Sequence, residues 1–220
     1  MEVVSFTEEN YLKIIYLLCE RKGGNEVNTN ELAEKTQTKA ASVSDMLRKL
    51  ADKSLINYKK YQGVTLTPNG ELIALKIIRK HRLWEVFLVD KLGFGWDEIH
   101  EIAEQLEHIE SAELTNRLDD FLENPEFDPH GDPIPNAVGK MPELGYKKLS
   151  EISMKKEVVM MGVSVHTSSF LQYLDKTKIV LGATIKVLEI NEFDKSLHIE
   201  LNNQSSVFIS YEVAKNILVK

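Results

Sequence analysis

Histidines and glutamates recur at helical spacing in two stretches in the middle of this chain. The segment HRLWE holds one such pair, four residues apart, and HEIAEQLEH holds four more such side chains at its first, fifth, eighth and ninth positions. At about 100° per residue, the four in HEIAEQLEH would project within an arc of roughly 100° on one helix face. Clustered carboxylates raise one another's pKa values, so such a group favours a bound cation. We predict a metal site formed by His81, Glu85, His100, Glu104, Glu107 and His108.

The ligand set offers imidazole nitrogen and carboxylate oxygen, and the single cysteine, Cys19, excludes a zinc site built from several thiolates. Such ligands suit Mn²⁺, Fe²⁺ or Zn²⁺ rather than Cu⁺, and oxygen-rich sites favour Mn²⁺. The alternative is an acidic, solvated helix face with incidental histidines. That alternative fits a lone His–Glu pair better than six ligand-type residues on two consecutive predicted helices.

A basic segment upstream has the pattern of a DNA-reading motif. Residues 35–60 hold seven basic side chains against two acidic ones. Short helices are predicted around 31–35 and 40–52, joined by a tight polar turn, and strands at 55–58 and 64–67 would form a wing. Small polar residues at the start of a recognition helix can reach base edges, and basic residues meet phosphates. The predicted DNA contacts are Lys39, Ala41, Ser42, Ser44, Asp45, Arg48, Lys49, Lys59, Lys60 and Tyr61.

Composition and charge are consistent with a soluble protein that has two kinds of ligand. The 220 residues are 43% hydrophobic and 28% charged, which excludes disorder of the whole chain. The net charge of −7 divides into +3 over residues 1–80, −10 over 81–150 and 0 over 151–220. An anionic partner is expected for the first part and cations for the second. The N-terminus lacks a secretory pattern and its apolar run is too short to span a bilayer, so we expect a cytoplasmic protein.

Outside the DNA-reading motif, the pattern predicts helices up to about residue 122 and strands from about residue 152. Thr7 is a plausible N-cap for a first amphipathic helix, and helices are predicted from about 71, over 96–109 and over 113–122. Residues 124–142 hold five of the six prolines and read as an irregular connector. From about residue 152, short β-type runs, including 158–161, 179–181, 185–188, 197–201 and 207–209, predict a small barrel.

These segments together resemble the diphtheria toxin repressor family of metal-dependent regulators. The resemblance is carried by TEENYLKIIYLL, NELAEKTQTKAASVSDMLRKLADKSLI, GVTLTPNGELIA, RKHRLWEVFL, EQLEHIES, DPHGDPIP and VHTSSFLQYLD. It implies a mainly α fold with a small β part. The implied domains are a winged helix-turn-helix (1–72), a helical metal-binding and dimerisation domain (73–142) and an SH3-like, FeoA-like small β-barrel (152–220).

The resemblance also assigns roles to individual residues. His81, Glu85 and His100 match ancillary-site ligands, whereas Glu104, Glu107 and His108 match primary-site ligands. Position 104 is Glu in the manganese-responsive branch and Cys in the iron-responsive branch. Six residues depart from the family pattern: Asn10 and Lys13 at N-terminal ligand positions, His166 and Ser169 at SH3-domain ligand positions, and Asp128 and Asp132 beside Arg82, where the iron branch holds an anion. Of these, Asn10 and His166 can still donate to a metal, and we include both among the candidate metal ligands.

The implied function is a metal-activated repressor that binds palindromic double-stranded DNA as a homodimer. Mn²⁺ is the expected metal, Fe²⁺ is the alternative, and Zn²⁺, Co²⁺ or Ni²⁺ could substitute in vitro. Leu114, Leu118 and Leu122 offer a dimer seam, and neither a membrane nor a small organic substrate is expected. The alternative from another class is a metal-dependent hydrolase using His81, Glu85, His100 and Glu107. A third hypothesis is that residues 152–220 form an independent module that binds proline-rich segments.

Overall fold

The computed structural model describes residues 4–59, 63–142 and 144–220. The chain divides into two compact units. Unit 1 comprises Met1–His81, Glu107–Glu110 and Pro135–Lys140. Unit 2 comprises Arg82–Leu106, Ser111–Ile134 and Met141–Lys220. The long helix α4 (Pro68–Asp90) contains the first boundary, so the two predicted histidine–glutamate segments both lie where the chain passes from one unit to the other.

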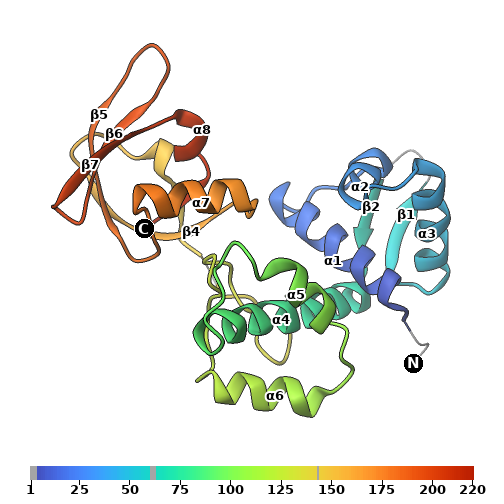
Figure 1. The fold of residues 1–220 in the computed structure, drawn as a ribbon. Helices are drawn as coiled ribbons and strands as arrows, with labels where there is room; N and C mark the ends of the chain where they lie inside the picture. Colours follow the sequence, from blue (N-terminus) through green and yellow to red (C-terminus); the bar gives the residue numbers. More distant parts are fainter. Residues whose placement is uncertain (1–3, 60–62, 143) are drawn as a thin grey trace. The chain divides into compact units, whose positions relative to one another are not determined.

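Unit 1 contains the predicted winged helix-turn-helix (Figure 1). Its elements are α1 (Phe6–Arg21), α2 (Thr29–Thr36), α3 (Ala40–Asp52) and the antiparallel strands β1 (Ile56–Lys59) and β2 (Gly63–Leu66). Apolar residues spaced three and four apart on the helices form the core, because that spacing lines one helix face. The largest fully buried side chains among them are Leu12, Ile15, Leu32, Leu47 and Leu50.

The helix starts in unit 1 depend on side chains that cap exposed backbone N–H groups. Asn28 caps α2 and forms a capping box with Glu31. The prediction of Thr7 as the cap of α1 is wrong, because Ser5 holds that position. The Ser5 hydroxyl accepts from the Glu8 backbone N–H, and the Glu8 carboxylate accepts from the Ser5 N–H, so α1 begins at Phe6.

Unit 2 contains the C-terminal part of α4 from Arg82 onward, together with α5 (His100–Leu106) and α6 (Ala112–Phe121). The predicted helix over 96–109 is shorter than expected, because a turn closed by the Glu98 N–H and the Gly95 carbonyl precedes it. Leu118 and Leu122, which we expected at a dimer seam, are instead buried in the apolar core of this unit. Leu114 is exposed, as a seam residue must be.

The rest of unit 2 is a six-stranded antiparallel sheet with strand order β3-β8-β4-β5-β6-β7. The strands are β3 (Lys147–Lys148), β4 (Glu157–Val163), β5 (Thr184–Ile190), β6 (Leu197–Leu201), β7 (Ser205–Ile209) and β8 (Ile217–Val219). Three short helices complete it: η1 (Leu149–Glu151), α7 (Ser168–Thr177) and α8 (Tyr211–Ala214). Alternating burial along β6 places one face of the sheet on the core.

The predicted strand at 179–181 is wrong. Lys178 adopts a left-handed conformation that ends α7, and the Ile179 N–H donates to the Leu174 carbonyl as part of the same helix terminus. Ile179 is therefore buried by the end of a helix, although its apolar neighbours resemble a strand. Among the described residues, no helix is long and apolar enough to cross a membrane.

Candidate metal centre and nucleic-acid interface

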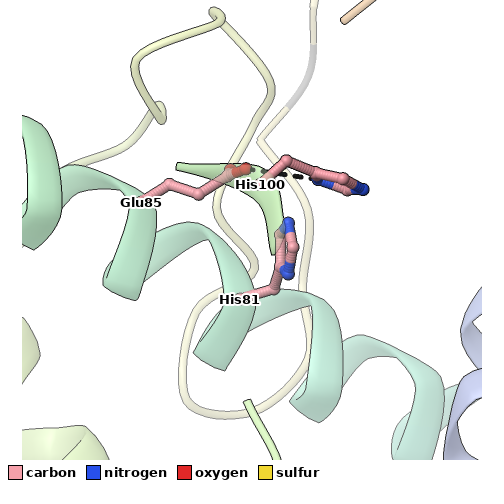
Figure 2. A group of neighbouring side chains, drawn as sticks. All are labelled: His81, Glu85 and His100. Atoms are coloured by element: carbon pink, nitrogen blue, oxygen red, sulfur yellow. Dashed lines mark ion pairs between the residues drawn. The ribbon is translucent and has the colours of Figure 1, made fainter. Parts of the chain in front are cut away.

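The first group of candidate ligands lies on α4 and at the start of α5. Figure 2 shows His81 and Glu85 one helical turn apart on α4, with the His100 side chain beside them. The three offer ligand atoms that all lie within 4.8 Å of one another. His100 Nδ1 is 3.7 Å from Glu85 Oε1, and its Nε2 is 3.8 Å from Glu104 Oε1. The i, i+4 spacing places His81 and Glu85 on one face of α4. The start of α5 then brings His100 beside them, so these three predicted ligands lie together.

Glu107 is the most enclosed of the predicted ligands, with none of its side chain exposed. With His81 and Glu104 it forms a second group whose ligand atoms lie within 4.8 Å of one another. His81 Nδ1 is 2.6 Å from Glu107 Oε2. Lys13 donates from its ammonium to both oxygens of the same carboxylate, at 2.6 and 2.8 Å. The sequence prediction did not include this ion pair, because the two residues are 94 positions apart.

His108 lies next to Glu107 but contacts the first turns of α1. Its Nδ1 is 2.8 Å from Glu9 Oε2, and its ring stacks on Phe6 at 4.7 Å between centroids. Its Nε2 is 3.7 Å from Glu107 Oε1. Because α5 ends at Leu106, Glu107 and His108 do not continue the helix face of His100 and Glu104, and the single-face geometry we predicted is wrong.

Asn10 supplies an independent sign that unit 1 can hold a cation. Its Oδ1 is buried, and this oxygen accepts no hydrogen bond from any described residue. An unmade bond at a buried polar atom is costly, and a metal ion would satisfy an amide oxygen. Asn10 is on α1 in the same unit as Glu107 and His108. Amide and carboxylate oxygens and imidazole nitrogens are donor types that fit a divalent cation.

A third group in unit 2 was missed by the sequence analysis. Glu85, Asp128 and His130 are all buried and offer ligand atoms within 4.8 Å of one another. Burial, followed by the charges of Glu85 and Asp132, raises the pKa of Asp128 well above its usual value. Burial alone would lower the pKa of His130, but the carboxylates of Glu85 and Asp128 outweigh it and raise this pKa to about 9. Carboxylates and an imidazole enclosed in this way are suited to binding a divalent cation.

The chain between Glu126 and Pro135 folds to support this third group. The Asp128 carboxylate accepts hydrogen bonds from the backbone N–H groups of His130 and Asp132. Gly131 has a φ of +85°, and a Cβ atom there would collide with the Met161 carbonyl oxygen. The Asp–Pro–His–Gly–Asp run was the available sequence signal, but we assigned it only to an irregular connector and to the position of an anion.

The other residues that we singled out near this group have different surroundings. His166 Nε2 is 3.6 Å from Asp132 Oδ2, and the His166 ring stacks on His130 at 4.5 Å. Burial lowers the pKa of His166 to about 4. Arg82 lies 3.7 Å from an Asp128 oxygen and 3.4 Å from an Asp132 oxygen, so internal carboxylates stand where the resemblance implied a bound anion.

The predicted DNA-reading residues lie on and beside α3 in unit 1. Lys39 is the N-cap residue of α3. The Arg48 guanidinium pairs with Asp45 at 2.8 Å on the surface, and the Ser44 hydroxyl donates to the Ala40 carbonyl. Apart from Ser44, which is half-buried, the exposed positions are Lys39, Ala41, Ser42, Asp45, Arg48, Lys49 and Lys59, whereas Lys60 and Tyr61 fall outside the described residues.

The fold and these clusters define a winged-helix protein with a candidate metal centre, and comparisons with known families agree. Residues 4–64 match the iron dependent repressor N-terminal DNA binding domain. Residues 67–136 match the iron dependent repressor metal binding and dimerisation domain, and residues 147–220 match the FeoA domain. The chain belongs to the diphtheria toxin repressor family.

Individual relatives cover different shares of the chain. The iron-dependent repressor IdeR of Mycobacterium tuberculosis is 36% identical over 141 residues, which are 63% of this chain and 60% of that protein. The diphtheria toxin repressor of Corynebacterium diphtheriae is 28% identical over 97% of this chain and 96% of its own length. A solved manganese-dependent transcriptional repressor in complex with manganese is 34% identical, with a TM-score of 0.87 over 96% of this chain and 98% of that one.

Proposed function

We propose that this protein is a metal-activated transcriptional repressor that binds DNA as a homodimer and responds to Mn²⁺. One observation carries the proposal: α1 joins the candidate metal centre to the DNA-reading helix within unit 1. Glu9 and Lys13 of α1 bind the side chains of His108 and Glu107. Glu8 of the same helix pairs with Lys49 at the end of α3.

A metal ion in unit 1 would act by fixing α1 against residues 107–108. Asn10, Glu107 and His108 are its proposed ligands there, with His81 of the same unit as a further donor. Glu104 of α5 is a proposed ligand because it groups with His81 and Glu107. The ion would supply positive charge at the buried Glu107 carboxylate, which contacts Lys13 and His81 in this structure. A ligand shifts a conformational equilibrium only through its different affinity for the two states, so the ion stabilises whichever position of α1 completes its coordination.

We propose two further groups of ligands besides the group around Asn10, Glu107 and His108. The first is His81, Glu85 and His100, and the second is Glu85, Asp128 and His130 with His166 beside it. Both contain nitrogen and oxygen donors without a thiolate, which supports Mn²⁺ over softer ions. The relative with manganese in its solved structure supports the same choice, whereas the iron-dependent relatives support Fe²⁺ as the alternative. Zn²⁺, Co²⁺ and Ni²⁺ are expected to substitute in vitro.

The partner that we propose is palindromic double-stranded DNA in the cytoplasm. The exposed lysines and arginine on α3 and β1 suit the phosphate backbone, and Ser42 at the start of α3 suits base edges. A two-fold homodimer would present two such helices to two half-sites. The three-part division into 1–72, 73–142 and 152–220 assigns DNA reading, metal binding with dimerisation, and a supporting FeoA-like role to successive segments.

The test is DNA selection followed by metal-dependent binding. Random duplexes are enriched on the full chain with Mn²⁺, and the selected sequence is labelled for anisotropy with Mn²⁺, with anaerobic Fe²⁺ and with a chelator. We expect an inverted repeat that binds tightly with Mn²⁺ and weakly with chelator. Equal affinity with and without metal would overturn the proposal.

Hydrolysis is the alternative function from another class. It predicts turnover of phosphate or carboxylate esters by the Mn²⁺-loaded protein. We propose that the centre is not catalytic, because its carboxylates and imidazoles are bound to α1 and to one another. Ester turnover lost in Glu107→Gln and retained in Arg48→Ala would contradict that view.

A further inference from the structure

The Glu107 carboxylate is already paired with a positively charged side chain of the protein itself, the ammonium of Lys13. The Lys13 ammonium lies 2.6 Å from Oε1 and 2.8 Å from Oε2, so it bridges both oxygens. The pair is buried, with 7% of the Lys13 side chain exposed and none of Glu107. His81 Nδ1 contacts Oε2 as well, at 2.6 Å.

These contacts occupy most of the positions at which the Glu107 carboxylate can accept a further hydrogen bond or bind a metal ion. A carboxylate offers about four lone-pair positions, of which the ammonium uses two and the His81 ring one. A divalent cation coordinated by the same oxygens would lie close to the ammonium, and like charges in a buried site repel strongly. Metal binding through Glu107 therefore requires the ammonium to give up at least one oxygen.

We propose that Lys13 is an internal competitor of the metal ion and sets the metal concentration at which the protein is activated. This inference rests on the proposed function, because it assumes that Glu107 is a ligand. In the metal-free protein the ammonium neutralises the buried carboxylate and stabilises the fold. When metal binds, that ion pair is exchanged for a metal–carboxylate contact, so the observed affinity is lower than the ligands alone would give.

The position of Lys13 on α1 makes the exchange relevant to DNA binding. Asn10 lies one turn earlier on the helix, and its buried Oδ1 accepts no hydrogen bond from a described residue. The same region of α1 thus carries a cation that the metal must displace and a neutral oxygen that can bind it. Exchange at Glu107 changes how α1 is bound to residues 107–108, and Glu8 of α1 pairs with Lys49 in the last turn of α3.

The test removes the charge of Lys13 in the full chain and measures metal affinity directly. Lys13→Met keeps an unbranched side chain of similar length, and Lys13→Gln keeps a hydrogen-bond donor for Glu107. Mn²⁺ is titrated by calorimetry, and the melting temperature is recorded with chelator and with saturating Mn²⁺. We expect both variants to bind Mn²⁺ at least about tenfold more tightly, which corresponds to about 1.4 kcal/mol. We also expect them to melt lower without metal and to show a larger Mn²⁺-induced rise.

Lys53→Met is the matched control. Lys53 pairs with the buried Glu8 at 3.0 Å in the same unit, with 13% of its side chain exposed. Its loss should lower the melting temperature without changing the Kd for Mn²⁺. This control distinguishes the general effect of losing a buried ion pair, which is lower stability, from the specific effect of freeing Glu107, which is tighter Mn²⁺ binding.

The Kd for Mn²⁺ in the Lys13 and Lys53 variants decides between the possible results. Tighter Mn²⁺ binding in Lys13→Gln with an unchanged Kd in Lys53→Met supports the inference, and it does so even if Lys13→Met fails to fold. Unchanged or weaker binding in Lys13→Gln overturns it and makes Lys13 a positioning residue for Glu107. A wild-type protein that binds neither Mn²⁺ nor Fe²⁺ overturns the proposed function, and the inference with it.

Discussion

Glu8 Oε1 and Lys53 Nζ lie 3.0 Å apart, and this ion pair joins the first turn of α1 to the end of α3. Lys49 Nζ lies 3.2 Å from the same oxygen. Burial by itself would raise the pKa of Glu8. The Ser5 backbone N–H and the two ammonium groups outweigh this effect and lower the pKa from 4.5 to about 2.

The depressed pKa of Glu8 predicts an acid-sensitive fold. A carboxylate with a lowered folded-state pKa stabilises the protein above its unfolded pKa and loses that effect as the pH falls from 4.5 to about 2. In this window its share of the unfolding free energy should fall by up to about 1.4 kcal/mol per pH unit. Urea denaturation from pH 7 to pH 2 should show a flatter profile for Glu8→Gln. Glu113→Gln, at an exposed pair, should follow the wild type, and parallel profiles for Glu8→Gln would contradict the assignment.

Arg48 should contact a phosphate. Loss of one phosphate contact weakens binding to all sequences alike and reduces the slope of log K against log salt by about 1. We expect this for Arg48→Ala in anisotropy titrations over a range of salt. Arg117→Ala removes another exposed arginine that pairs with a carboxylate, on α6, and should leave the slope unchanged. If Arg48→Ala kept the wild-type DNA affinity and salt dependence, Arg48 on α3 would not contact a phosphate, and the proposed placement of α3 on DNA would be wrong.

Asn10 should control the metal concentration for activation. An amide oxygen is a neutral, weaker ligand than a carboxylate for a hard cation. Asn10→Asp should therefore lower the Mn²⁺ concentration for half-maximal DNA binding, and Asn10→Ala should raise it. Asn136→Asp, at a turn in the same unit, is the control for added charge. No change in either Asn10 variant would mean that α1 couples to the metal through packing alone.

Glu104 should set the ranking of metals. A thiolate is soft and favours Fe²⁺ and the later metals, whereas a carboxylate tolerates Mn²⁺. Glu104→Cys should therefore move the preference in competitive titrations toward Fe²⁺, Co²⁺ or Ni²⁺. Glu101→Cys, exposed on the same helix, controls for adventitious thiol binding. An unchanged ranking after Glu104→Cys would count against Glu104 as a ligand.

The buried group in unit 2 should hold its own metal ion. His130→Gln removes an imidazole from Glu85 and Asp128, so the number of Mn²⁺ ions bound per chain should fall by one in equilibrium dialysis. His198→Gln is the matched control, because that ring stacks on Phe208 in the sheet. If His130→Gln bound as many Mn²⁺ ions per chain as the wild type, Glu85, Asp128 and His130 would not form a metal site.

Local sequence was sufficient for much of this fold. The predicted helix over 40–52 has the same bounds as α3, and the wing strands lie within a residue or two of their predicted ranges. Helix periodicity, capping residues and strand alternation act over a few positions, so they can be read directly from the chain. The pairing of His81 with Glu85 was predictable for the same reason, since a single helical turn joins them.

Contacts between distant segments were not readable in this way. Lys13 and Glu107 are 94 positions apart, and their ion pair depends on α1 packing against residues 107–108. Asp128 and His130 become candidate ligands only because a loop in a proline-rich connector places them beside Glu85. Whether such groups bind protons, each other or a metal depends on their burial and on nearby charges, and folding determines both.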